Sequence, residues 1–131
     1  MSVGLLIISH GRIGEALMDT AVSVLGLCPL QAEVMSIGQD CEPDSQIAEA
    51  RQRIAALDQG EGVLVLTDMY GSTPGNIAGQ LAGDRIAVVA GVNLPMLVRL
   101  LNYPQMGLEQ LVAKAVTGGR DGVLPYATQG D

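Results

Sequence analysis

Short apolar runs alternate along the chain with longer stretches in which apolar residues recur at helical spacing. The runs consist almost wholly of Val, Leu, Ile and Ala, which is typical of strands buried on both faces of a parallel sheet. They predict strands at residues 3–8, 62–67 and 85–90, with a weaker one at residues 30–37. The periodic stretches predict helices at residues 13–25, 47–57, 73–83, 95–102 and 108–117.

Glycine, proline and threonine mark several of the expected boundaries. Thr73 is placed as the N-cap of the third helix, with Pro74 at the first helical position. Gly118 and Gly119 are expected to end the last helix, and residues 123–124 to form a short final strand. Each of these boundaries is a prediction from local turn chemistry alone.

The order of the elements predicts the fold class. Alternating strands and helices with right-handed crossovers give an α/β fold, an open doubly wound and mostly parallel sheet with helices on both faces. A chain of 131 residues is long enough to bury one core. We expect a single domain over residues 1–125 and a loosely held C-terminal tail over residues 126–131.

Charge and composition narrow the range of partners. The net charge is −7 and no cluster of Lys or Arg occurs, so nucleic acid and anionic membrane surfaces are poor partners, and a basic protein is a better one. Cys28 and Cys41 stand apart and the chain has one histidine, so no metal site is expected. Without a signal sequence or an apolar run of bilayer length, we expect a cytoplasmic protein that does not insert into membranes.

His10, the only histidine, directly follows the first predicted strand, and Asp68 follows the third. In doubly wound sheets ligands bind beyond the carboxyl ends of the strands, where these two side chains would meet. A carboxylate that accepts the proton of one ring nitrogen fixes the tautomer and leaves the other nitrogen as a nucleophile. The alternative is that His10 is only a hydrogen-bonded turn residue, and its position alone favours neither.

Two helix starts near the same rim could attract an anion. Gly11 and Gly14 flank the first, and the GSTP segment, residues 71–74, precedes another. Taken alone, GSTP is equally explained as a capped helix start without a ligand. Arg12 is interpreted as a solvated residue and Asn93 as a helix cap.

Nucleotide-binding motifs are missing from the sequence: it has no G-x-x-x-x-G-K-[ST], no G-x-G-x-x-G and no carboxylate cluster for Mg²⁺. We therefore expect no cofactor. An imidazole, a carboxylate and an anion cradle together could carry a phosphoryl group on nitrogen.

Four motifs in order along the chain carry a family resemblance: SHG, LVLTDMYGSTPGNIA, AGVNLPMLV and AVTGGRDGV. With them the sequence resembles the enzyme IIA domain of mannose-type phosphotransferase systems. The resemblance implies that His10 accepts a phosphoryl group from the phosphocarrier protein HPr and passes it to an enzyme IIB component, while Asp68 orients the ring. It also implies a phosphate site, which we place at Gly11, Gly71, Ser72 and Thr73.

The resemblance extends to assembly. Family members are typically homodimers that exchange a short antiparallel edge strand, which would match residues 122–124. Many members continue through an Ala/Pro-rich linker into a IIB domain, whereas this chain stops soon after Asp121, so we expect the IIB acceptor to be a separate protein.

Three other interpretations stay open. The protein could be a regulatory phosphocarrier of an incomplete phosphotransferase system, whose phosphorylation state is read by a protein partner. It is also similar to a phosphoryl carrier that serves dihydroxyacetone kinase. A third possibility is a small tetrapyrrole chelatase, in which a histidine after the first strand binds the metal.

Overall fold

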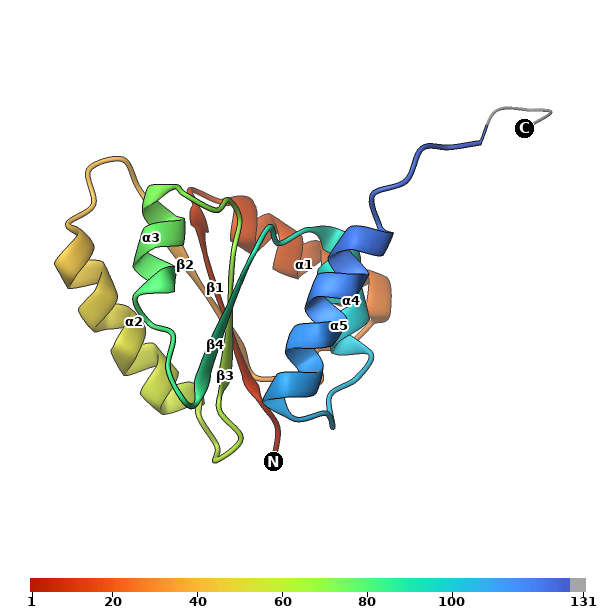
Figure 1. Cartoon of the computed structure of the whole chain (residues 1–131), viewed down its shortest axis with the longest axis horizontal. Helices are drawn as coiled ribbons and strands as arrows, with labels where there is room; N and C mark the ends of the chain where they lie inside the picture. The colour runs from red at the N-terminus through yellow and green to blue at the C-terminus, as the bar shows by residue number, and fades with distance from the viewer. Residues whose placement is uncertain (128–131) are drawn as a thin grey trace.

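Four parallel strands form one open sheet in the computed structural model, which describes residues 1–127. The strands lie side by side in the order β2-β1-β3-β4 (Figure 1). Their bounds are Gly4–His10 for β1, Ala32–Ile37 for β2, Val63–Thr67 for β3 and Ile86–Ala90 for β4. The central strands β1 and β3 are almost wholly buried, as their continuous apolar sequences predict.

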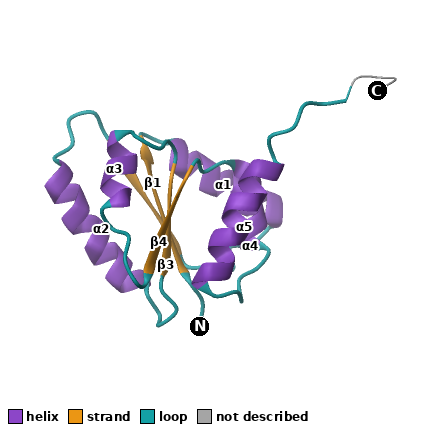
Figure 2. Cartoon of the chain, viewed as in Figure 1, coloured by secondary structure: helices purple, strands orange, loops and turns teal. Residues whose placement is uncertain are grey.

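Within residues 1–127, five helices cover the two faces of this sheet (Figure 2). On one face lie α1 (Ile13–Leu25), α4 (Leu94–Leu101) and α5 (Leu108–Asp121), and on the other lie α2 (Pro43–Leu57) and α3 (Thr73–Gly79). This arrangement confirms the predicted α/β class, a parallel sheet with helices on both faces. Of the helices described, none has the length and apolar character needed to cross a bilayer.

The hydrophobic core has two halves, one on each face of the sheet, and β1 contributes to both. Leu5 and Ile7 pack under α1, α4 and α5, whereas Leu6 and Ile8 pack under α2 and α3. All four side chains are fully buried, and each such burial contributes roughly 2 kcal/mol to folding. The strand that leads into His10 is therefore firmly anchored from both sides.

The strand order has its point of reversal at the carboxyl end of the sheet, which is the upper end in Figure 1. From β1 the chain crosses to β2 on one side and then returns to β3 on the other, so the order reverses between β1 and β3. At such a reversal the connections lead away in opposite directions and leave a gap in which ligands bind. His10 is the last residue of β1 and Asp68 directly follows β3, so both border this gap.

Contrary to the prediction, the last helix does not end at its paired glycines but continues through them to Asp121. Gly118 and Gly119 are buried because α5 packs tightly on α4. A Cβ atom at Gly118 would lie 2.7 Å from Cβ of Arg99, and one at Gly119 would lie 2.9 Å from Cε of Met96. The glycines allow close helix packing here rather than ending a helix.

Two other predicted boundaries were wrong by one turn. The helix α2 begins at Pro43, four residues before the predicted start, because proline fits the first helical position without losing a hydrogen bond. The helix α3 ends at Gly79 rather than near Gly83, and the chain then turns so that the buried Leu81 enters the core under α2 and α3.

The predicted antiparallel edge strand is not present in this single chain. Residues 122–127 follow α5, leave the body of the protein and pair with no strand (Figure 1). The backbone N–H and C=O groups of a strand need hydrogen-bond partners on a neighbouring strand. Within the described part of the chain, no strand lies beside residues 122–124. The end of the predicted tail, residues 128–131, lies outside the described residues.

Candidate functional site

The backbone around His10 is held by both neighbouring strands. The His10 N–H donates to Oδ2 of Asp68 at 3.0 Å, beyond the end of β3. The next N–H, that of Gly11, donates to the carbonyl oxygen of Ile37 at 3.1 Å, at the end of β2. Gly11 has a φ of +43°, a left-handed conformation that lets the chain turn from β1 into α1 within two residues.

The His10 ring contacts the same carboxylate oxygen as its backbone. Its Nδ1 atom lies 2.7 Å from Oδ2 of Asp68. An ionised carboxylate can only accept hydrogen bonds, so Nδ1 donates to it, and in the neutral ring Nε2 is the nitrogen that keeps its lone pair. The side chain is 43% exposed, and Nε2 has no hydrogen-bond partner among the described residues. In the neutral ring, one nitrogen is therefore left without a hydrogen-bond partner within residues 1–127.

Asp68 is nearly buried, with 10% of its side chain exposed. Burial raises the pKa of this carboxyl, but the hydrogen bonds from the His10 ring and backbone, together with charge attraction, outweigh it and bring the pKa below the ordinary value of 3.8. The second oxygen, Oδ1, is buried and has no partner within residues 1–127. Asp68 is therefore an anion at neutral pH whose carboxylate is bound chiefly by His10.

A cleft of about 500 Å³ opens beside the histidine. Its lining comes from the ends of β1 and β2 and from the start of α3: His10, Gly11, Ile37, Gly38, Gln39, Thr73 and Pro74. The residues at and after the end of β2, 37–39, were not among the predicted site residues. The signal was nevertheless present, because the rule that placed His10 at a strand end applies equally to the end of β2.

The GSTP segment forms the predicted helix start, but one residue earlier than expected. Ser72, not Thr73, is the N-cap of α3: its Oγ accepts the Gly75 N–H at 3.2 Å and donates to the carbonyl oxygen of Met69 at 2.6 Å. Thr73 takes the first helical position instead and lines the cleft. Gly71 has a φ of +82° in the turn before the cap, and neither it nor Ser72 lines the cleft.

Of the six predicted site residues, His10, Gly11 and Thr73 line the cleft, and Asp68 contacts the His10 ring. Asn93 caps α4, as predicted: its Oδ1 accepts the Met96 N–H at 2.9 Å. Arg12 is exposed and, within residues 1–127, forms an ion pair only with Glu15, at 3.5 Å. Among the described residues, no group of three or more His, Cys, Asp and Glu side chains is arranged to hold a metal ion.

Comparison with known proteins points to one family, both by a family model and by sequence identity. A family model described as "PTS system fructose IIA component" matches residues 4–116. The mannose-specific EIIAB component of the PTS system of Escherichia coli K12 is 36% identical over 132 residues, which cover 94% of this chain and 39% of that protein. The chain thus spans about two fifths of the length of the curated relatives it matches.

Solved structures agree with this match. The mannose/sorbose specific IIA subunit of the phosphotransferase system from Enterococcus faecalis superposes with a TM-score of 0.83 at 27% identity, over 98% of this chain and 100% of that one. Component EIIA from Streptococcus agalactiae superposes with a TM-score of 0.80 over 94% and 96% of the two chains. At 20% identity, this second likeness concerns the fold alone.

Proposed function

Because this chain belongs to the family of phosphotransferase-system (PTS) IIA components, we propose that it carries a phosphoryl group on Nε2 of His10 between two protein partners. The observation that supports this most directly is the contact of 2.7 Å between His10 Nδ1 and Asp68 Oδ2. It fixes the tautomer that a phosphoryl acceptor needs. The donor would be phosphorylated HPr and the acceptor a separate IIB component, both in the cytoplasm.

The proposed transfer needs two imidazoles and no activated water. The lone pair of His10 Nε2 attacks phosphorus, a new N–P bond forms, and the N–P bond to the donor imidazole breaks with its electron pair returning to that ring. The His10 ring keeps its Nδ1 proton and gains positive charge, which the Asp68 carboxylate stabilises. Onward transfer is the same step in reverse, with the acceptor's nucleophile in place of the donor.

The site is accessible enough for this exchange, because nearly half of the His10 side chain faces solvent and the cleft opens beside it. Positioning of the two reacting rings then supplies much of the rate. The net charge of −7 favours a partner with a basic face, as we expect of the donor.

We assign the phosphate to the start of α3 and the turn after β1, at Thr73, Ser72, Gly71 and Gly11. Thr73 lines the cleft, and its hydroxyl makes no hydrogen bond within the described part of the chain. The other three residues shape the turns around the phosphate, because their polar groups are engaged elsewhere. The Gly11 N–H donates to Ile37, and the Ser72 hydroxyl donates to Met69 and accepts from Gly75. A weak cradle suits a carrier, since tight phosphate binding would hinder onward transfer.

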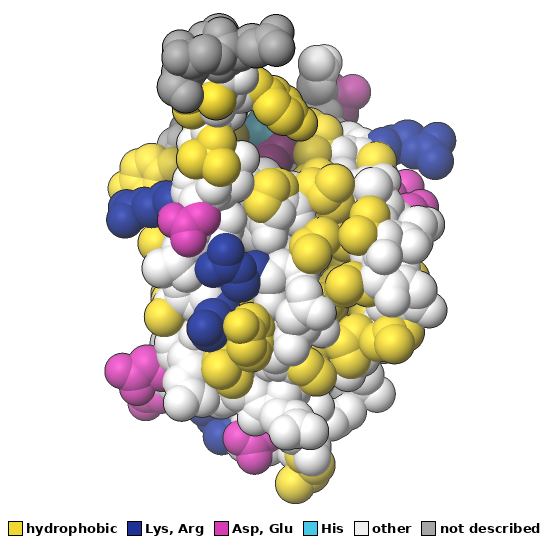
Figure 3. All heavy atoms as spheres, turned by 90° about the vertical axis from the view of Figure 1, so that its right-hand side faces the viewer, with side chains coloured by type: hydrophobic (Ala, Val, Ile, Leu, Met, Phe, Trp, Pro, Cys, Tyr) yellow, Lys and Arg dark blue, Asp and Glu magenta, His cyan; other side chains and the backbone are white. Residues whose placement is uncertain are grey.

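We further propose that the protein acts as a homodimer that exchanges residues 122–124 as an antiparallel edge strand. Beyond α5, Val123, Leu124 and Tyr126 are 75%, 75% and 99% exposed. Figure 3 shows hydrophobic side chains gathered at this end of the molecule, below the grey tail. Three large apolar side chains so close together are unfavourable in water and indicate a surface that another chain covers.

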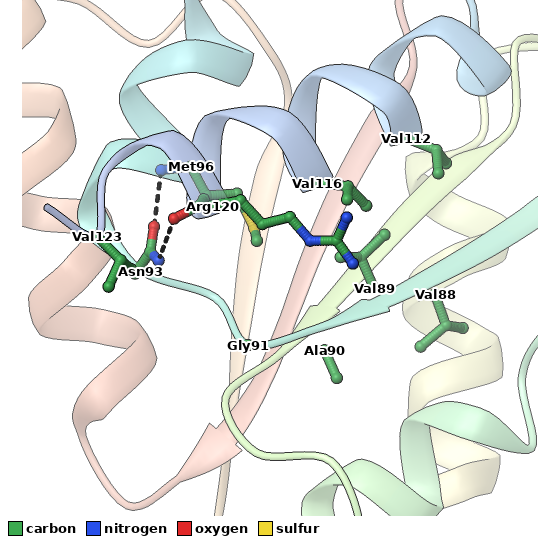
Figure 4. Close-up of a pocket in the computed structure, with 11 residues that line it drawn as sticks. Val88, Val89, Ala90, Gly91, Asn93, Met96, Val112, Val116, Arg120 and Val123 are labelled. Carbon is green, nitrogen blue, oxygen red and sulfur yellow. Dashed lines mark hydrogen bonds between the residues drawn. The ribbon is translucent and has the colours of Figure 1, made fainter.

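The surface that receives the exchanged strand from the other chain would be the edge of β4 that faces away from β3. In a parallel strand, the N–H and C=O of one residue point to the same side, and those of the next residue point to the opposite side. The Arg85 carbonyl accepts a hydrogen bond from Val63 of β3. By alternation, the N–H and C=O groups of Val88 and Ala90 point away from β3, toward the free edge. A groove of about 520 Å³ runs between this edge and α5. Five of its eleven lining residues are valines, and Figure 4 shows Arg120 extending along it toward Val89. An added apolar strand would pair with β4 and cover the groove.

The direct test of the carrier function is phosphorylation in vitro. Incubation with phosphoenolpyruvate, enzyme I and HPr is expected to place an acid-labile, base-stable phosphate on the wild-type chain. His10→Ala should remain unlabelled, and circular dichroism should show that it is folded. An unlabelled wild type, or full labelling of His10→Ala, would contradict the proposal.

A further inference from the structure

Ser9, the residue before His10, is fully buried and polar, and none of the roles described so far accounts for it. Side chains alternate along a strand, so Ser9 points toward α1 while His10 points toward the cleft at α3. The Ser9 Oγ atom accepts the backbone N–H of Gly14 at 2.8 Å, in the first turn of α1. Its own hydrogen is directed toward the His10 carbonyl oxygen, at 3.5 Å.

This contact replaces the usual cap of the helix. Helix starts are normally satisfied by a side chain at the N-cap position, but Arg12 occupies that position in α1 and makes no cap hydrogen bond. Ser9 supplies the missing acceptor from the end of β1, three residues earlier in the chain. The start of α1 is therefore bound directly to the strand that carries the histidine.

Gly14 matches Ser9 sterically. A Cβ atom at Gly14 would lie 2.8 Å from Ser9 Oγ and 2.9 Å from both Ile7 Cγ2 and Val34 Cγ1. Only glycine lets the first turn of α1 come this close to the sheet, and only this approach brings the Gly14 N–H within reach of the serine. The two residues thus form one joint between β1 and α1.

The consequence is that three successive residues are fixed by three different elements. Ser9 is held by α1, the His10 N–H by Asp68 beyond β3, and the Gly11 N–H by Ile37 at the end of β2. Without the Ser9 contact, the turn of Gly11 and Arg12 would be held on two sides only. The direction in which the His10 ring leaves the strand depends on that turn.

We propose that Ser9 is a positioning residue for phosphoryl transfer: by binding Gly14 it sets the start of α1 and thereby the placement of His10 Nε2 relative to an incoming phosphoryl group. This rests on the proposed carrier function. Ser9 lies on the opposite face of β1 from the cleft and touches no reactant. Its effect is on the rate of the chemical step, not on the docking of the donor.

The test compares Ser9→Ala with Ser36→Ala. Ser36 is a matched control because it also bonds α1 from a neighbouring strand, through Glu15 at 3.4 Å, but at an exposed position. The four buried apolar residues of β1 keep Ser9→Ala folded. Initial rates of transfer from phosphorylated HPr are measured over a range of HPr concentrations, at a temperature where circular dichroism shows all three chains to be folded.

We expect kcat of Ser9→Ala to fall about 10- to 100-fold with KM for phosphorylated HPr unchanged, since small misplacements of reacting groups have effects of this size. Ser36→Ala should match the wild type. A wild-type kcat in Ser9→Ala, or a loss confined to KM, overturns the inference and leaves the carrier function intact. An unlabelled wild type overturns the carrier function, and this inference with it.

Discussion

Replacing Asp68 by asparagine tests the central contact of the site with almost no change in shape. In the native protein Oδ2 accepts two hydrogen bonds, from the His10 backbone N–H at 3.0 Å and from the ring Nδ1 at 2.7 Å. Both are bonds to an anion. The amide that Asp68→Asn introduces can offer the same two donors a neutral oxygen, or it can turn its NH₂ group toward them.

The backbone N–H of His10 decides between these two orientations. It cannot face an NH₂ group, because two donors would then oppose each other, so the amide oxygen takes the place of Oδ2. The Nδ1 proton stays where it is, and Nε2 remains the free nitrogen. The NH₂ group then takes the buried position of Oδ1, which receives no hydrogen bond within the described residues. The variant therefore keeps the tautomer but loses the charge.

The size of both effects follows from hydrogen-bond energetics. A bond to a charged group contributes about 1.5–3 kcal/mol and a neutral one about 0.5–1.5 kcal/mol, so charging one partner strengthens a bond by roughly 1–1.5 kcal/mol. The bond from the ring to the Asp68 anion strengthens by about this amount as the ring becomes imidazolium-like, and Asp68→Asn loses that gain in the transition state. Because about 1.4 kcal/mol is a factor of ten in rate, transfer should slow about tenfold. Because the two hydrogen bonds to Asp68 become bonds to a neutral oxygen, the free energy of unfolding should fall by about 1–3 kcal/mol.

Rapid-quench measurement of transfer from phosphorylated HPr gives the rate, and urea unfolding gives the stability. ¹⁵N spectra of the His10 ring report which nitrogen carries the proton. A wild-type rate in folded Asp68→Asn refutes the role of the charge. A spectrum with the proton moved to Nε2 refutes the argument about amide orientation, and the loss of rate should then far exceed tenfold.

The lowered pKa of Asp68 predicts how the stability of the fold depends on pH. Its pKa is lower in the native state than the ordinary value of 3.8, so the unfolded chain binds this proton more readily. The stability that the carboxylate contributes is present above pH 3.8 and is lost as the pH falls through the lower native pKa. In Asp68→Asn this part of the pH dependence of unfolding should be missing.

Three other predictions concern parts of the fold away from the site. Gly118→Ala should lower the free energy of unfolding by about 1–3 kcal/mol in urea titrations, because its methyl group would overlap Arg99, whereas Gly107→Ala meets no atom within 4 Å and should change it by less than about 1 kcal/mol. Asp58→Asn should lower the urea midpoint at pH 7, because Asp58 binds Arg85 through both oxygens at 2.8 and 3.0 Å. Those bonds lower the pKa of Asp58 to about 2, so the difference between wild type and Asp58→Asn should shrink as the pH falls toward 2, and a constant difference would contradict this. Val88→Pro, which removes an outward N–H at the β4 edge, should shift the protein toward monomer in analytical ultracentrifugation, and a wild-type monomer would contradict the proposed dimer.

The features that the sequence predicts well are those that depend on general rules of α/β sheets. Continuous apolar runs identified the buried strands, and the rule on strand ends brought His10 and Asp68 to one rim, where the structure places them 2.7 Å apart. The contact supports a nucleophilic ring nitrogen, and the family match adds phosphoryl transfer as the chemistry proposed for it.

Glycine shows where such rules fail. A pair of glycines after an amphipathic stretch predicts a helix end from local propensity, yet Gly118 and Gly119 lie inside α5, because the neighbouring helix leaves no room for a side chain. Gly14 lies in the first turn of α1, where glycine lowers helix stability slightly compared with alanine. Its role is clear only from the structure, in which Ser9 and Val34 leave no room for a Cβ atom. In both places the residue is determined by an element distant in sequence.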